Sequence, residues 1–149
     1  MTTQGASPQD LEFRRAVEAC EVSPAAFDHA AHVRLAYVNL CDHSIDGAVE
    51  RMRTSLLEFL AHVRADPGKY HETITRAWIM AVHHFMGQST RHDSAESFMQ
   101  ANPVLLDSRI MLTHYSAEVL FSPEARRSFV QPDLQSIPPP RQASQGTAR

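Results

Sequence analysis

Residues 27–40 read FDHAAHVRLAYVNL, and this stretch decides the fold. Asp28 is a favourable N-cap, because its short carboxylate can accept a hydrogen bond from a free backbone N–H of the first helical turn. The apolar residues that follow recur at helical spacing, at Val33, Ala36, Tyr37 and Leu40. The stretch therefore predicts a helix that begins after Asp28, ends near Cys41 and buries one face.

The same kind of pattern continues on both sides of this stretch. It predicts further helices at about 8–20, 46–65, 69–86, 94–101 and 105–114, with a last helical turn after Ser122-Pro123. Pro67-Gly68 and Asn102-Pro103 are predicted breaks, and Gly87 is a predicted stop. Because the period-2 alternation of strands is absent, we expect an all-α fold. It would be a single compact helical bundle of four to five main helices over residues 1–131.

The end of the chain has a different composition. From residue 132 onward the sequence loses helical periodicity and becomes rich in Pro, Ser and Gln, as in IPPPRQASQGTAR. Such a composition lacks the apolar residues that a packed core needs. We therefore expect residues 132–149 to form a flexible, disordered tail.

Size, charge and cysteine content exclude several classes of protein. The chain has 149 residues, which suits one domain, and its formal net charge of −3 disfavours a nucleic-acid binder. No signal peptide and no apolar run of membrane-spanning length is evident, so we expect a cytoplasmic protein without membrane contact. Cys20 and Cys41 are too few for a disulfide framework. A homodimer is a further possibility that the sequence leaves open.

Nine histidines are an unusual feature of a chain of this length. The connections between the second, third and fourth predicted helices are short, so neighbouring helices should be antiparallel. The second and fourth helices would then begin at the same end of the bundle. His29 and His32 lie in the first turn of the second helix, and His71 lies in the first turn of the fourth. His114 would return to the same level.

Converging histidines are typical of a transition-metal site. The positive end of a helix dipole disfavours imidazolium, and neutral imidazole is the form that binds a metal ion. His29, His32 and His71 would be ligands of one divalent ion (Fe, Cu, Zn or Ni) and would leave a coordination position open. His114 would be a fourth ligand or would support the others. Each histidine alone has the alternative of capping a helix or bonding a backbone carbonyl.

Three residues around His71 are candidates for catalysis. Glu72 could move a proton, orient an imidazole or bind the metal. Its alternative is an ordinary i, i+4 ion pair with Arg76 on a solvated helix face. Lys69 could pair with an anionic group of a substrate. Tyr70 could donate its hydroxyl to the substrate, with simple packing as the alternative.

The known catalytic signatures that we considered are absent. The sequence has no G-x-G-x-x-G, P-loop, G-x-S-x-G, C-x-x-C or H-E-x-x-H motif. The Glu-x-x-His pairs of di-iron bundles are also missing.

Two main segments and two shorter ones resemble the sequences of a known protein family. FDHAAHVRLAYVNL (27–40) and PGKYHETITRAW (67–78), with ANPVLLD (101–107) and HYS (114–116), resemble a family of small, all-helical bacterial proteins that pair an F-x-H-x-x-H segment with a K-Y-H-E-T segment. The resemblance covers about residues 27–134. It implies that the residues to watch are His29, His32 and the Lys69–Thr73 run. In architecture alone the chain is also similar to the DinB-like bundles, which hold a metal with three histidines.

These observations favour a small metal-dependent enzyme that acts on a small polar metabolite. Redox chemistry of the oxygenase or oxidase type is favoured over hydrolytic or lyase chemistry, because the expected interior is apolar and offers few hydrolytic groups. Two alternatives stay open. The chain could be a non-catalytic module that binds a metal or a small molecule, or a metal-free catalyst that uses His71 and Glu72 as acid and base.

Overall fold

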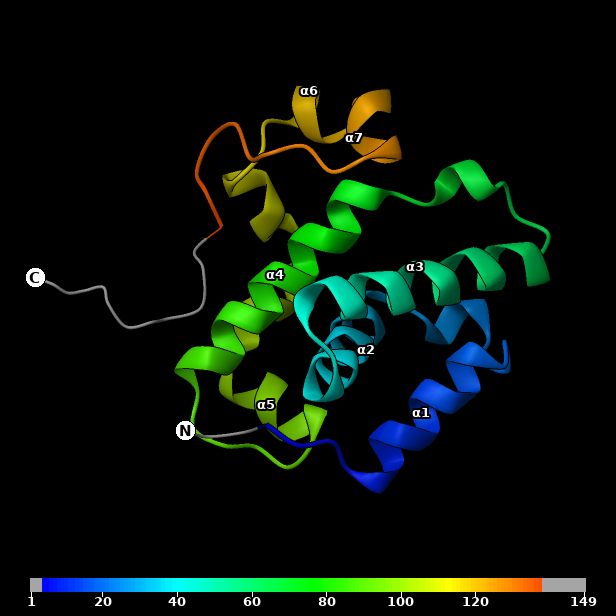
Figure 1. The fold of residues 1–149 in the computed structure, drawn as a ribbon, viewed down its shortest axis with the longest axis vertical. Helices are drawn as coiled ribbons and strands as arrows, with labels where there is room; N and C mark the ends of the chain where they lie inside the picture. Colours follow the sequence, from blue (N-terminus) through cyan, green and yellow to red (C-terminus); the bar gives the residue numbers. More distant parts are fainter. Residues whose placement is uncertain (1–3, 138–149) are drawn as a thin grey trace, which may run out of the picture.

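The computed structural model describes residues 4–137, and within that range every regular element is helical. Figure 1 shows α4 running through the molecule, with α1, α2 and α3 on one side of it and α6 and α7 near its beginning. The α-helices are α1 (Pro8–Glu18), α2 (His29–Asp42), α3 (Ile45–His62), α4 (Glu72–Gln88), α5 (Ala95–Ala101), α6 (Ala117–Leu120) and α7 (Pro123–Arg127). The prediction of an all-α bundle is confirmed.

The first helices begin where their capping residues predict. Ser7 forms a capping box with Asp10: the Ser7 hydroxyl accepts from the Asp10 N–H, and the Asp10 carboxylate accepts from the Ser7 N–H. The Asp28 carboxylate accepts from the N–H of Ala31 at 3.0 Å and starts α2. Ser44 caps α3 in the same way through Gly47. The local signals therefore set these helix starts before any tertiary packing is considered.

The fourth helix differs from its prediction at both ends. Asp66 accepts from the N–H of Gly68, and residues 67–69 form a separate 3₁₀ turn, η2 (Pro67–Lys69), instead of the first turn of the helix. α4 then begins at Glu72 with His71 as its N-cap. At the other end Gly87 lies inside α4, so its prediction as a stop is wrong. No glycine among the described residues has a positive φ, so Gly87 is not used as a left-handed terminator.

The segment after α5 is more broken than predicted. The expected helix at 105–114 is two 3₁₀ helices, η3 (Pro103–Leu106) and η4 (Ser108–Thr113). Asp107 separates them, because its side chain accepts from the N–H of Arg109 and starts a new turn. The short helix α6 was not predicted, whereas α7 begins at Ser122-Pro123 as expected.

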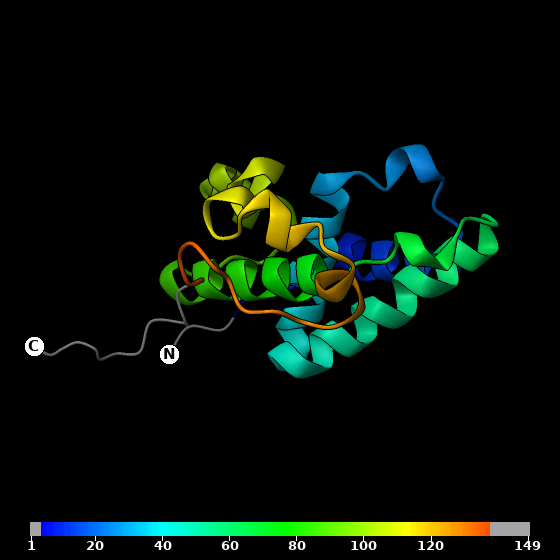
Figure 2. The same ribbon diagram turned by 90° about the horizontal axis from the view of Figure 1, so that it is seen from above.

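The chain after α7 returns past the beginning of α4, as Figure 2 shows. The Thr73 hydroxyl donates to the carbonyl of Ser128 at 3.0 Å and accepts from the N–H of Val130 at 3.1 Å. Within the predicted tail, residues 133–136 are exposed, whereas Ile137 is 6% exposed and belongs to the core cluster. Residues 138–149 of that tail lie outside the described residues.

The core lies between α2 and its neighbours. One contiguous cluster contains apolar residues from α1 to α5 and from the C-terminal segment, with Leu35, Tyr37, Ile79, Phe98 and Tyr115 among its fully buried members. Among residues 4–137, no helix is both long and apolar enough to cross a bilayer. The helices packed around this core hold the histidines in place.

Candidate functional site

A cavity of about 530 Å³ lies between the beginning of α2, the first half of α4, and the segment that contains η4 and α6. Its wall is mostly apolar, and its size is in the range of small-molecule sites. Its wall includes His29, His32, Thr75, Trp78, Arg109, Leu112 and Phe121. We call this cavity the larger chamber.

A second cavity of about 360 Å³ adjoins the first. The two share five wall residues, namely Phe27, His32, Leu56, Ile74 and Thr75. Lys69, Tyr70 and His71 line only the second, which we call the smaller chamber. The beginnings of α2 and α4 therefore meet around one two-chambered cavity.

His32 lies on the wall that the two chambers share. Its ring stacks on Phe27, with a centroid separation of 4.2 Å and an interplanar angle of 11°. Its Nδ1 lies 2.8 Å from the carbonyl of Asp28, and a carbonyl can only accept, so Nδ1 carries the proton. Burial lowers the pKa of His32 below its ordinary value. The ring is therefore neutral at pH 7, and Nε2 is a bare nitrogen that can accept a hydrogen bond or bind a metal.

His29 lies one turn earlier on α2 and has a similar arrangement. Its Nε2 is 3.0 Å from the carbonyl of Leu105, so Nε2 donates and Nδ1 is the nitrogen without a proton in the neutral ring. The ring also meets the edge of Trp78 at a centroid separation of 4.6 Å. α2 thus presents two imidazoles to one chamber, each oriented by a backbone carbonyl.

His71 is used differently from the two histidines of α2. Its Nδ1 accepts from the N–H of Ile74 at 3.1 Å and caps α4. Its Nε2 donates to the carbonyl of Leu120 at 2.7 Å. Burial lowers the pKa of His71, so the ring stays neutral. Because both nitrogens are engaged within the protein, His71 has no lone pair left for a metal ion in this structure.

Glu72 belongs to a polar cluster with Arg53 and Tyr70. Arg53 donates to both carboxylate oxygens, at 2.9 and 2.7 Å, and the Tyr70 hydroxyl donates to one of them at 2.7 Å. The hydrogen bonds from Arg53 hold the pKa of Glu72 below its usual range. Burial raises the pKa of Tyr70. Glu72 is thus a fixed carboxylate that ties α3 to α4, and its partner is Arg53 rather than the predicted Arg76, which pairs with Asp46.

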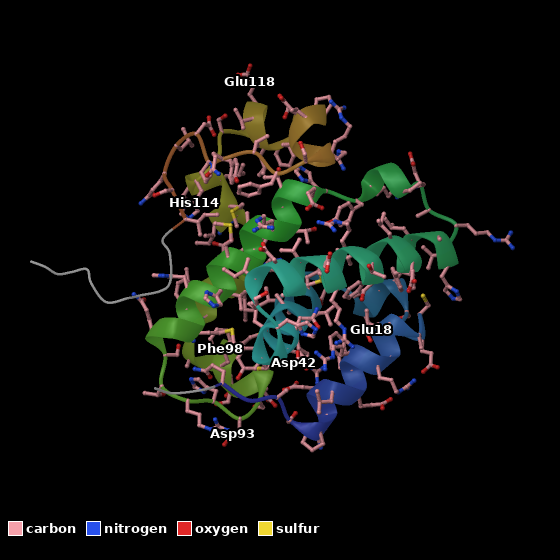
Figure 3. The ribbon with its side chains drawn as sticks, viewed as in Figure 1. Glu18, Asp42, Asp93, Phe98, His114 and Glu118 are labelled. Carbon is pink, nitrogen blue, oxygen red and sulfur yellow. The ribbon has the colours of Figure 1, made fainter. Side chains whose placement is uncertain are left out.

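His114 and Lys69 occupy different surroundings. The Nδ1 of His114 donates to the carbonyl of Gln135 at 2.8 Å, and His114 lines a separate small cavity beside Ile137. Figure 3 shows His114 on the side of the molecule where the C-terminal segment passes. Lys69 is exposed and lines the smaller chamber.

The predicted convergence of four histidines is thus realised in part. His29 and His32 share the larger chamber, His71 lines the adjoining one, and His114 lies elsewhere. Within residues 4–137 no group of three His, Cys, Asp or Glu side chains is arranged to hold a metal ion. The arrangement offers two oriented imidazoles on an apolar cavity.

Sequence reasoning missed most of the cavity wall. Thr75, Trp78, Leu112 and Phe121 follow no motif, and their common position depends on how α4 packs against η4 and α6. The exposure of Phe121 (54%) and Leu112 (42%) marks the rim, but a sequence shows apolar residues without showing which are exposed.

Comparison with protein-family models, with curated proteins and with solved structures found no match for this chain. The function must therefore be argued from the cavity itself.

Proposed function

We propose that the protein binds a small, mostly apolar molecule in the larger chamber, with His29 and His32 as its polar contacts. The observation that carries this proposal is the pairing of an apolar wall with two imidazoles that backbone carbonyls orient. Small-molecule sites are typically apolar cavities with a few well-placed polar groups.

The chemistry of the two histidines indicates what the ligand should present to them. His32 is held neutral by burial, and its bare Nε2 accepts a hydrogen bond. A ligand with a hydroxyl or amino group at one end would pair with it, whereas a purely apolar ligand would leave this nitrogen unsatisfied at a cost of about 1–3 kcal/mol. The preferred ligand therefore combines an apolar body with a hydrogen-bond donor.

Trp78 provides a direct test, because it is the only tryptophan of the chain and lines the larger chamber. The probe is 1-aminoanthracene, a fluorescent apolar amine. We expect saturable energy transfer from Trp78 to the bound probe. Thr75→Leu places a larger apolar side chain on the wall of both chambers and should abolish the transfer.

Thr54→Leu is the matched control, since Thr54 is exposed on α3 and lines neither chamber. It should bind the probe as the unaltered protein does. Unfolding curves would show that both variants are folded. Absence of saturable transfer in the unaltered protein, or equal binding by Thr75→Leu, would contradict the proposal.

A second candidate is metal-dependent catalysis on a small metabolite, with redox chemistry favoured. The observation in its favour is that His29 and His32 lie i, i+3 on α2 and each donates its other N–H to a carbonyl. Metal-binding histidines are commonly oriented in this way. Since the described residues supply no third ligand, the remaining positions on Fe, Cu, Zn or Ni would be taken by water and substrate.

Elemental analysis of untagged protein and titration with Zn²⁺ test this candidate. About one equivalent of metal that is lost in His32→Ala and kept in His114→Ala would support it. If the protein is isolated without metal and takes up none of the four ions, metal-dependent catalysis is contradicted and small-molecule binding is the proposal that remains. Metal retained in His32→Ala would show that the ion binds at another place.

A further inference from the structure

The smaller chamber has a positively charged mouth. Lys69 is the only lysine of the chain, and it is an exposed member of a wall that is otherwise largely apolar. Within residues 4–137 no carboxylate lies within 4 Å of its ammonium group, since Lys69 occurs in none of the ion pairs. The charge of Lys69 is therefore not neutralised by a neighbouring acid.

Arg126 of α7 bonds to the backbone of the turn that carries Lys69. Its Nη1 donates to the carbonyl of Gly68 at 3.1 Å and to that of Lys69 at 3.4 Å. The charge of Arg126 also contributes to lowering the pKa of His71, which lines the smaller chamber. As with Lys69, the described part of the chain gives Arg126 no carboxylate partner.

The two acids closest to Lys69 in sequence accept hydrogen bonds from other groups. Asp66 accepts from the N–H of Gly68, and Glu72 is held by Arg53 and Tyr70. Lys69 thus lines the smaller chamber without an ion-pair partner, and Arg126, which does not line it, donates to the backbone carbonyls of Gly68 and Lys69. An anion that binds Lys69 would also be attracted by the charge of Arg126.

Arg109, which lines the larger chamber, differs from Lys69 because it is paired with a carboxylate. Arg109 makes two hydrogen bonds to the carboxylate of Asp107, at 3.0 and 3.1 Å, which neutralise its charge. The two-chambered cavity therefore has an unpaired cation at Lys69, whereas the larger chamber has a paired Arg109, the carboxylate of Asp28 and an apolar wall at Trp78 and Phe121. The five shared wall residues join the two chambers.

We propose that the ligand is an amphiphilic anion, a single apolar chain with a carboxylate or phosphate head. The head lies beside Lys69, and the chain passes Thr75 into the larger chamber, where the hydrogen-bond donor that the proposed function requires meets Nε2 of His32. This inference rests on the function proposed above and gives the ligand a chemical class. A free fatty carboxylate and an alkyl phosphate share this chemistry, so both are included in the test.

Three probes with the same ten-carbon chain separate the contributions of head and chain: decanoate, decyl phosphate and the uncharged decanol. Binding is followed by the fluorescence of Trp78 and by calorimetry. We expect decanoate or decyl phosphate to bind about tenfold more tightly than decanol at low salt, with the difference reduced by added salt. The tighter of the two anions identifies the head group.

Charge-removing variants locate the head. Lys69→Gln and Arg126→Gln should each weaken binding of the preferred anion roughly threefold to tenfold and leave decanol unchanged. Arg127→Gln is the matched control, because Arg127 is the next residue of α7 and is exposed, whereas the bonds to the carbonyls of Gly68 and Lys69 come from Arg126. This control should bind both classes of probe as the unaltered protein does.

The single lysine permits an independent readout. Reductive methylation with ¹³C-formaldehyde gives one labelled lysine, whose NMR signal should shift with the anions and stay in place with decanol. Decanol binding as tightly as both anions, or Arg127→Gln weakening the anions as much as Lys69→Gln, would overturn the inference. If 1-aminoanthracene binds and neither anion does, the inference fails while the proposed function stands. If no probe binds, both fail.

Discussion

The long helices and the C-terminal segment from residue 102 onward are held in place by different interactions. α2 and α4 contribute runs of fully buried apolar side chains, such as Leu35 and Ile79. The C-terminal segment is made of short turns that contribute single buried side chains to the same core, and several of its positions are also fixed by single hydrogen bonds. The Tyr115 hydroxyl donates to the carbonyl of Val130 at 2.6 Å, and His71 donates to that of Leu120.

The difference explains why the cavity lies where the two regions meet. Helices that pack by apolar stripes interdigitate and leave little space. The C-terminal segment packs through single buried side chains, such as Met111 and Leu120, rather than through a continuous apolar stripe, and η4 and α6 supply the outer wall of the larger chamber. The helices therefore carry the stability, and the C-terminal segment shapes the site.

The largest expected effect on the free energy of unfolding comes from making the same substitution, Leu to Ala, in each of the two regions. Leu35 is fully buried in α2, so Leu35→Ala should lower the free energy of unfolding by about 2–5 kcal/mol. Leu134 is 59% exposed, and Leu134→Ala should change it by no more than about 0.5 kcal/mol. Urea unfolding measures both. Equal losses would show that Leu134 is packed as tightly as Leu35.

His71 joins the two regions, and its replacement should have the next largest effect. His71→Ala removes the cap of α4 and the bond to Leu120, with an expected loss of about 2 kcal/mol. His71→Asn keeps a side chain that can cap the helix and should recover about half of this loss. If His71→Asn is no more stable than His71→Ala, the cap contributes little.

The dependence of stability on pH should reflect the buried histidines. Burial lowers the pKa of His32 and of His71 in the folded state, whereas the unfolded value is near 6.5. The unfolded chain therefore binds more protons below about pH 6.5, and stability falls as the pH falls below that value. Above it, both states are neutral and the contribution is constant.

Urea unfolding between pH 5 and 8 measures this dependence. His32→Asn and His71→Asn should each flatten the curve between pH 5 and 6.5. A curve that keeps its full slope in the double variant would assign the loss of stability to other groups.

The smallest expected effect concerns Gly87, which was predicted to end α4 and lies within it. It is exposed and has no positive φ, so a methyl group should be tolerated. Gly87→Ala should raise the free energy of unfolding by about 0.5 kcal/mol, because alanine loses less backbone entropy on folding. A shift of the thermal midpoint to a lower temperature would contradict this assignment.

The sequence predicts most of the helical region and little of the site. Helix starts at Ser7, Asp28 and Ser94 depend on local capping, which single residues reveal. The beginning of α4 was misplaced because His71 acts as a cap, a role that more often falls to Ser, Thr, Asp or Asn. The role of His71 as a metal ligand was inferred from its helical position, and its bond to Leu120 spans 49 residues, which no local pattern shows.

The pairing of His29 and His32 was predictable from their spacing, because residues three apart share a helix face. The carbonyl of Leu105 that orients His29 was not, since it depends on how η3 lies against α2. The contact of Arg126 with the carbonyls of Gly68 and Lys69 was not predictable either, because it depends on how α7 packs against the beginning of α4.

The most direct test of the cavity as a binding site is ¹⁵N NMR of the histidine rings, with and without 1-aminoanthracene. The account predicts that His32 stays neutral at pH 7 with its proton on Nδ1, and that its Nε2 signal moves when the probe binds. The signals of His71, whose nitrogens are both engaged, should change far less. If His32 titrates near pH 6.5 and its Nε2 signal is unaffected by saturating probe, the chamber beside His32 is not the binding site.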